Sequence, residues 1–198
     1  ATLADYAADV GAVLRAAGID SYDLYGEGVG AALALELATQ DVDRVGKVVL
    51  DQPVFADDDA RVDLIAHFAP SIEAKWDGSH WLTSWHMLRD RSFFWPWYSR
   101  TQDAVRWRDP EIDPADLQVR LLDWLKGRAT YGDYVRACLG ANPKAYKALR
   151  QPVLVCAVDG DALAQHADRI VDALPNANRQ EWQDNPSVFA AAIATFLG

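Results

Sequence analysis

Three closely spaced glycines are the first residues whose types and spacing could support chemistry. Gly26, Gly28 and Gly30 lie in the stretch LYGEGVGAALALELA, where a short apolar strand is expected to lead into an alanine-rich helix. A glycine-rich turn of this kind serves two classes of site. In the nucleophile elbow, G-x-S-x-G, the central residue holds a reactive oxygen above a sheet. In the dinucleotide fingerprint, G-x-G-x-x-G/A, the glycines let the backbone approach a pyrophosphate.

The dinucleotide interpretation rests on residues 26–31 and on Asp51. The stretch GEGVGA fits the fingerprint, and Asp51 ends the next expected strand, where an acidic residue would bind the ribose. Two features oppose this interpretation. A long helix is expected before the strand, and only two strand–helix steps precede a tryptophan-rich block, which is too few for a dinucleotide half-fold. Dinucleotide binding is therefore the third of the functions that we consider.

The elbow interpretation places Gly28 where the reactive oxygen should be. Glycine has no side chain, so no acyl intermediate can form on it. The flanking glycines would still allow a sharp corner between strand and helix. The sequence does not distinguish natural loss of a serine at this position from a deliberate serine-to-glycine change.

The elements around this turn are expected to alternate along the chain. Residues 1–54 predict a helix, a strand, a helix and a strand, and residues 151–198 predict a strand, a helix, a strand and a helix. Residues 55–150 predict mainly helices. Such alternation favours a parallel sheet with helices on both faces. The middle block would then lie above the carboxyl ends of the strands, where open α/β sheets bind their ligands.

The chain resembles the α/β-hydrolase superfamily over nearly its whole length. The similarity lies in DYAADVGAVLRAAGIDSYDLYGEGVGAALALELA, DRVGKVVLDQP, QPVLVCAVDGDALAQHADRIVDALPNA and NPSVFAAAIATFL, in this order. The resemblance implies an α/β fold with a mostly parallel sheet, flanking helices and an inserted helical cap at residues 55–150. The first strands of the family have no counterpart in the sequence. An additional N-terminal segment or a partner chain would then complete the sheet.

The resemblance also implies a set of site residues. Gly28 takes the position of the nucleophile, the backbone N–H of Val29 would donate to the oxyanion, and Glu27 would contact the substrate. Asp161 matches the acid position after the penultimate strand, and Asp51 matches an alternative acid position one strand earlier. No metal ion and no cofactor are expected.

The catalytic histidine of the family has no counterpart before the last helix. His67, His80 and His86 belong to the cap, and His166 is expected on the surface of the helix that follows the acid strand. Without a base, a hydroxyl nucleophile is weak at neutral pH. The residues as they stand are therefore expected not to carry out triad hydrolysis.

Two explanations account for the missing machinery. The protein could be a natural pseudoenzyme, or its natural chain could carry a longer N-terminus and a histidine loop, joined in this sequence between Trp182 and Pro186. We favour the second explanation, because the loss of both a half-sheet and one short loop would be unusual for an evolved protein.

The segment WDGSHWLTSWHMLRDRSFFWPWYSR, residues 76–100, is unusually rich in aromatic residues. Most of these side chains would pack the cap against the core, because aromatic groups bury large areas. Some would form the roof of a pocket for a small apolar or aromatic molecule. The candidates are Trp81, Trp85, His86, Phe94, Trp95 and Trp97.

Composition narrows the partners. The formal net charge of −10 argues against nucleic acid and against anionic membranes, since like charges repel. Cys138 and Cys156 lie in apolar surroundings and predict free buried thiols, which indicates the cytoplasm. The expected full-length or ancestral activity is hydrolysis of a small apolar ester, lactone or amide. The alternative is a non-catalytic protein that binds a ligand in an aromatic pocket.

Overall fold

The computed structural model describes residues 1–106, 109–181 and 186–198. The chain begins with helix α1 (Leu3–Ala16). Thr2 caps this helix, because its hydroxyl accepts a hydrogen bond from the Asp5 N–H while the Asp5 carboxylate accepts one from the Thr2 N–H. Helix α1 packs on α2 (Gly30–Gln40), the alanine-rich helix that follows the glycine turn.

Four strands form one parallel sheet in the described part of the chain. Their order is the order of the sequence, and every adjacent pair runs parallel. Asp51 lies opposite Glu27 on one side and Cys156 on the other, so the carboxyl ends of three strands meet at one edge. The mostly parallel sheet predicted from the sequence is confirmed. The strands are β1 (Tyr22–Glu27), β2 (Val45–Asp51), β3 (Val153–Ala157) and β4 (Ala177–Glu181).

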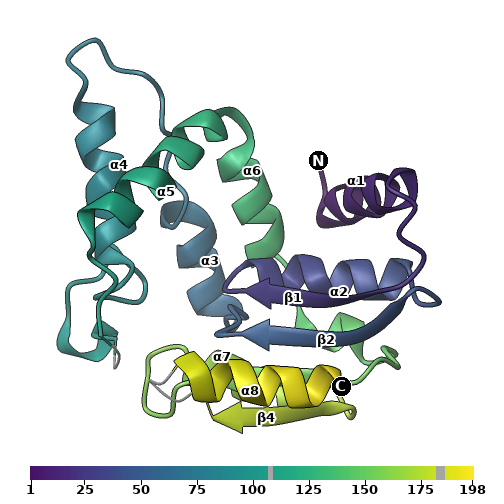
Figure 1. Cartoon of the computed structure of the whole chain (residues 1–198). Helices are drawn as coiled ribbons and strands as arrows, with labels where there is room; N and C mark the ends of the chain where they lie inside the picture. Colours follow the sequence, from purple (N-terminus) through teal and green to yellow (C-terminus); the bar gives the residue numbers. More distant parts are fainter. Residues whose placement is uncertain (107–108, 182–185) are drawn as a thin grey trace.

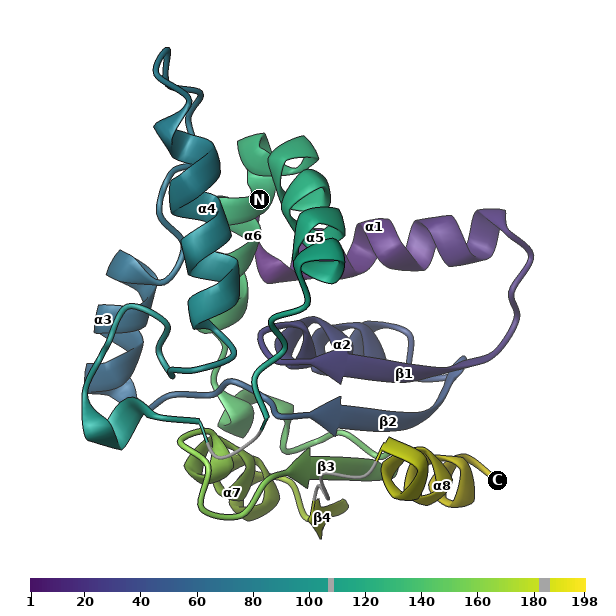
Figure 2. The ribbon, with the colours of Figure 1, turned by 60° about the vertical axis from the view of Figure 1, so that its left-hand side comes forward.

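Helices cover both faces of the sheet, as Figures 1 and 2 show. Val48 and Leu50 pack in one apolar cluster, whereas Val49 between them packs in another, because alternate residues of a strand point to opposite faces. The first cluster takes side chains from α2 and from α7 (Ala164–Ala173). The second packs against α8 (Pro186–Leu197).

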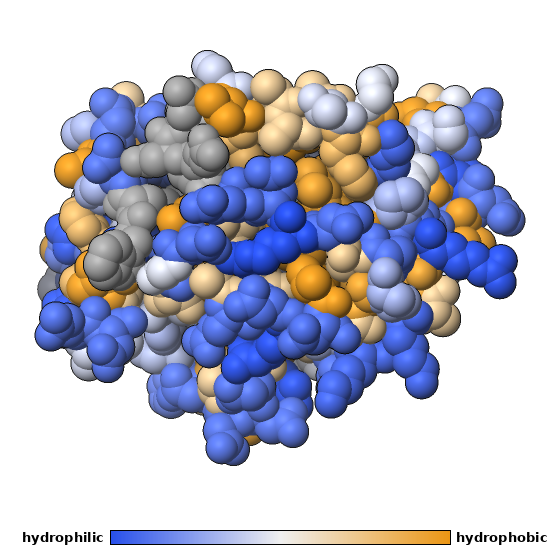
Figure 3. All heavy atoms as spheres, turned by 90° about the horizontal axis from the view of Figure 1, so that it is seen from below, coloured by the Kyte–Doolittle hydropathy of each residue, from blue (hydrophilic) through white to orange (hydrophobic). Residues whose placement is uncertain are grey.

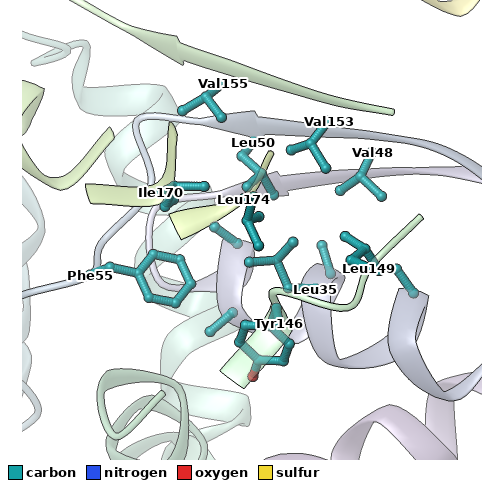
Figure 4. Close-up of a cluster of buried hydrophobic side chains, with 14 of the residues drawn as sticks. Leu35, Val48, Leu50, Phe55, Tyr146, Leu149, Val153, Val155, Ile170 and Leu174 are labelled. Atoms are coloured by element: carbon teal, nitrogen blue, oxygen red, sulfur yellow. The ribbon is translucent and has the colours of Figure 1, made fainter. Parts of the chain in front are cut away.

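Figure 4 shows the first cluster, in which strand residues meet helix residues. Val153 and Val155 of β3 and Leu35 of α2 are fully buried there, together with Ile170 of α7. Burial of a large aliphatic side chain contributes about 1.5–3 kcal/mol. This cluster therefore holds β1, β2 and β3 against α2, and with them the glycine turn that joins β1 to α2.

The helical insertion, residues 55–150, lies between β2 and β3. In Figures 1 and 2, α3, α4 and α5 lie beyond the ends toward which the strand arrows point. An apolar cluster that joins Val54, Leu64, Phe68 and Leu163 fastens the insertion to the sheet edge. Its elements are α3 (Asp58–His67), α4 (Ser79–Asp90), the 3-10 turn η1 (Gln102–Ala104), α5 (Pro114–Lys126), α6 (Arg128–Leu139) and the 3-10 turn η2 (Pro143–Tyr146).

One local expectation is wrong. His166 does not lie on the surface but is 3% exposed, because α7 turns this residue toward the insertion rather than toward solvent. The expected join between Trp182 and Pro186 involves residues 182–185, which lie outside the described residues.

The surface is strongly polar on at least one side. The face in Figure 3 is dominated by hydrophilic side chains, with smaller apolar areas among them, in keeping with the formal net charge of −10. Across the described ranges, the structure contains no helix with the length and hydrophobicity of a membrane span.

Candidate active-site pocket

The glycine turn forms a tight corner between β1 and α2. Gly28 has a φ of +56°, in the left-handed region, and Val29 already has helical angles at the start of α2. Two hydrogen bonds tie the corner to the neighbouring chain: the Gly28 N–H donates to the Asp51 carbonyl at 2.9 Å, and the Val54 N–H donates to the Gly28 carbonyl at 3.0 Å. The corner is therefore a fixed part of the sheet edge.

The glycines of this corner are needed for different reasons. A Cβ atom on Gly26 would lie 2.8 Å from the Gly30 carbonyl oxygen and 2.9 Å from the Ala31 Cα, so only glycine lets the strand and helix approach this closely. A Cβ atom on Gly28 would meet no heavy atom within 4 Å. The corner thus has room for a side chain at position 28, although none is present.

A cavity of about 420 Å³ opens at this corner. That volume lies within the range of small-molecule pockets, roughly 300–1,000 Å³. The floor comes from the sheet edge and the roof from the helical insertion. The described lining residues are Glu27, Gly28, Val29, Gln52, Val54, Phe68, Leu88, Arg91, Ser92, Trp95, Arg106, Glu111, Arg120, Asp123, Trp124 and Leu163.

Asp161 lies in the loop after β3 and is almost fully buried. Its carboxylate accepts hydrogen bonds from the Arg106 Nε at 3.0 and 2.8 Å and from the Leu163 N–H at 2.9 Å. Arg106 also donates to Gln52, which has an unusual positive φ of 43°. A guanidinium from the insertion therefore holds the Asp161 carboxylate in place.

Asp51 lies at the end of β2, opposite Glu27 of β1, and it is buried. The Tyr25 hydroxyl donates to its Oδ2 at 2.5 Å, and burial together with this bond raises the pKa of Tyr25. A buried carboxylate engaged by a neighbouring phenol is poorly placed to bind a ribose. This arrangement argues against dinucleotide binding.

Some of the residues that the sequence suggested for the pocket line the cavity, and others do not. Glu27, Gly28, Val29 and Trp95 line the cavity. The other candidates are absent from the described lining of the cavity. They are Trp81, which is 47% exposed, Trp85 and Trp97, which pack among apolar side chains, Phe94, which pairs with Val105 outside the cavity lining, and half-buried His86.

Of the four histidines, all of which the structure describes, His166 is the buried one, and it contacts Trp95. The Trp95 indole N–H donates to His166 Nε2 at 3.3 Å. Burial lowers the pKa of His166 to about 4, so the imidazole is neutral at pH 7. It lines a separate, smaller cavity of about 200 Å³ and is absent from the described lining of the larger one.

Sequence reasoning missed the polar side chains of the insertion that reach the cavity. Arg91 lies inside the aromatic segment and Arg106 lies beyond it, and neither was among the candidates. Trp124 lies on α5, outside the aromatic segment. The strong helical pattern of α5, with Leu117, Leu121 and Leu125 buried, indicated which face of this helix is buried but not what that face would meet.

Metal binding receives no support from the described residues, which include no group of three or more His, Cys, Asp or Glu side chains that could hold an ion. The arrangement is instead that of an open α/β protein with a ligand-sized pocket at the carboxyl edge of its sheet.

Similar solved structures identify the fold. A hydrolase from Pseudomonas aeruginosa PA01 matches all of this chain and 72% of its own, with a TM-score of 0.68 and 20% identity. Est816, an N-acyl homoserine lactone degrading enzyme, matches 98% of this chain and 74% of its own, with a TM-score of 0.63 and 18% identity. MGS-M2, an α/β-hydrolase enzyme from a Medee basin deep-sea metagenome library, matches 97% and 70%, with a TM-score of 0.63 and 15% identity.

The chain has the α/β-hydrolase fold. No protein-family model and no curated protein match the sequence. The identities of 20% or less mean that the likeness defines the fold, and the chemistry has to be argued from the site.

Proposed function

We propose that the pocket binds a small, partly apolar carbonyl compound, such as an ester, lactone or amide, without hydrolysing it by a triad. The observation that carries the proposal is the corner at Gly28, which has the left-handed backbone and the free space of an elbow but no reactive atom. The engagement of Asp161 by Arg106 supports the same conclusion, because this acid is not available to orient a base.

The ancestral activity proposed here is hydrolysis of such a compound. In a relative with serine at position 28, the hydroxyl would project into the cavity, and the Val29 N–H at the start of α2 would donate to the oxyanion. One structural neighbour, Est816, is described as an N-acyl homoserine lactone degrading enzyme. The buried, unpaired thiols Cys138 and Cys156 support a reducing compartment, and we propose the cytoplasm.

Two measurements test the proposal. Titration with a small apolar ester should quench tryptophan fluorescence saturably, since Trp95 and Trp124 line the cavity, and no product should form. Gly28→Ser should leave hydrolysis of a nitrophenyl ester at the background rate, because the variant gains a hydroxyl but no base. Saturable turnover by Gly28→Ser would show that a base is present. Product formation by the unaltered protein would refute the non-catalytic assignment, and the absence of binding would refute the pocket.

A further inference from the structure

Arg91 is a cation in the pocket wall without an acidic partner among the residues that the structure describes. It follows the last turn of α4, and its Nε atom is buried without a hydrogen bond. Its one hydrogen bond within the described chain is a long one, 3.5 Å from Nη2 to the neutral Tyr131 hydroxyl. No described carboxylate lies within 4.0 Å of the guanidinium.

Two aromatic rings hold the guanidinium in place. Its central carbon lies 4.3 Å from the centre of the Trp124 ring and 4.7 Å from that of Phe68. Contacts of this kind stabilise a cation through the faces of the rings, while the N–H edges of the guanidinium stay available for hydrogen bonds. Burial also lowers the pKa of Arg91, which shows that the charged form is poorly solvated here.

The other lining arginines differ from Arg91 in having carboxylate partners. Arg106 is paired with buried Asp161 at 2.8 Å, and Arg120 is paired with Glu111 at 2.8 Å. Of the lining carboxylates, Asp123 is paired with Lys126 at 3.0 Å, and Glu27 ends β1 on the sheet side of the cavity. Of the three arginines among the described lining residues, Arg91 is therefore the one available to bind an anion.

We propose that Arg91 binds the carboxylate of a small organic acid whose apolar part lies against Phe68, Leu88 and Trp124. This inference rests on the pocket of the proposed function and names the class of ligand within it. A planar guanidinium matches a carboxylate, to which it can donate two parallel hydrogen bonds. Arg91 alone can neutralise a monoanion but would leave much of the charge of a phosphate uncompensated.

The test compares phenylacetate with phenylacetamide, which has nearly the same shape and no charge. The unaltered protein should bind phenylacetate roughly 10- to 100-fold more tightly, the usual range for a charge-assisted hydrogen bond in a wall closed to water. Binding can be followed by tryptophan fluorescence and by calorimetry. Inorganic phosphate should not displace phenylacetate.

Arg91→Gln should abolish the preference for the acid while leaving binding of the amide. The matched control is Arg89→Gln, which removes the same charge two residues earlier on α4 from a side chain paired with Asp90 outside the cavity. This control should keep the preference. In the unaltered protein, the Nε–H resonance of Arg91 should shift when phenylacetate is added, a readout that does not depend on the variant folding.

The outcomes separate the two proposals. Equal binding of acid and amide, or an unchanged Arg91 resonance, overturns the carboxylate site and leaves the pocket standing. A preference that persists in Arg91→Gln, or competition by phosphate, also overturns it. Failure of both compounds to bind overturns the pocket itself, and the carboxylate site with it.

Discussion

At the scale of the residue, Gly26 and Gly28 show how two glycines of one turn meet different demands. Gly26 lies where strand and helix touch, and Gly28 lies where the backbone turns left-handed beside open space. The first demand is steric and cannot be relieved without moving α2. The second costs a non-glycine residue about 1–3 kcal/mol of backbone strain.

Alanine substitutions separate these demands. Gly28→Ala should lower the free energy of unfolding by about 1–2 kcal/mol, because only the left-handed backbone opposes it. Gly26→Ala should lower it further, since its Cβ would overlap backbone atoms at 2.8 and 2.9 Å. Urea unfolding of both variants measures the difference. Equal losses, or a larger loss for Gly28→Ala, would contradict the close approach at Gly26.

His166 belongs to the same scale, because its burial makes stability depend on pH. The unfolded chain protonates this residue below about pH 6.5, whereas the folded chain does so only below about pH 4. The unfolded state therefore binds more protons between these values, and stability falls as the pH is lowered through them.

The pH dependence provides a test. Between pH 7.5 and 4.5, His166 alone should cost about 2–3 kcal/mol of unfolding free energy. His166→Gln should lose correspondingly less stability over this interval than the unaltered protein. His67→Gln, at a histidine whose side chain is 61% exposed, is the control and should follow the unaltered protein. Identical pH profiles for all three proteins would show that His166 is not held neutral.

At the scale of the element, a buried ion pair connects the insertion to the sheet edge. Arg106, after η1, reaches Asp161 in the loop after β3, and their side chains are only 6% and 1% exposed. A buried charge without its partner is strongly destabilising, since neither water nor a counter-ion solvates it. The pair therefore fixes the position of the roof over the corner.

Removal of this arginine should be costly. Arg106→Gln should lower the free energy of unfolding by about 3–5 kcal/mol. Arg120→Gln, in an exposed pair with Glu111, should cost less than about 1 kcal/mol. Both values come from chemical denaturation. Similar small losses for the two variants would mean that solvent reaches Asp161 and that the connection is weak.

At the scale of the whole molecule, β1 forms an open edge of the described sheet. Among the described strands it pairs with β2 only. Asp23, Tyr25 and Glu27, which alternate along one face of β1, are exposed. Charged residues on an edge strand discourage pairing between molecules. An added strand, from a further segment of the chain or from a partner, would pair along this edge.

Hydrogen exchange tests whether the edge is open. The Gly28 N–H donates toward β2, so alternation directs the Leu24 and Gly26 amides to β2 and the Tyr25 and Glu27 amides outward. The outward amides should exchange faster than their inward neighbours. Equal protection of the Tyr25 and Gly26 amides would show that another strand covers the edge. If this protection increased with protein concentration, the added strand would come from a partner copy.

Much of the fold was predictable from local sequence. The alternation of helices and strands, the apolar runs at residues 48–50 of β2 and 153–157 of β3, and the glycine turn at residues 26–30 all depend on neighbours in the chain. The structure has them in the predicted order. The absence of a nucleophile at Gly28 is likewise plain from the sequence. Periodicity and turn chemistry act over a few residues, so they can be read without knowing what packs where.

The composition of the pocket was decided only by tertiary structure. Within the insertion, Trp85 and Trp97 pack among other apolar side chains. Arg91, which follows α4, and Trp124 of α5 contact each other at the cavity. The same packing turned His166 inward and joined Arg106 to Asp161 across 55 positions of sequence. Such contacts depend on the angles at which whole elements meet, and no local pattern encodes those angles.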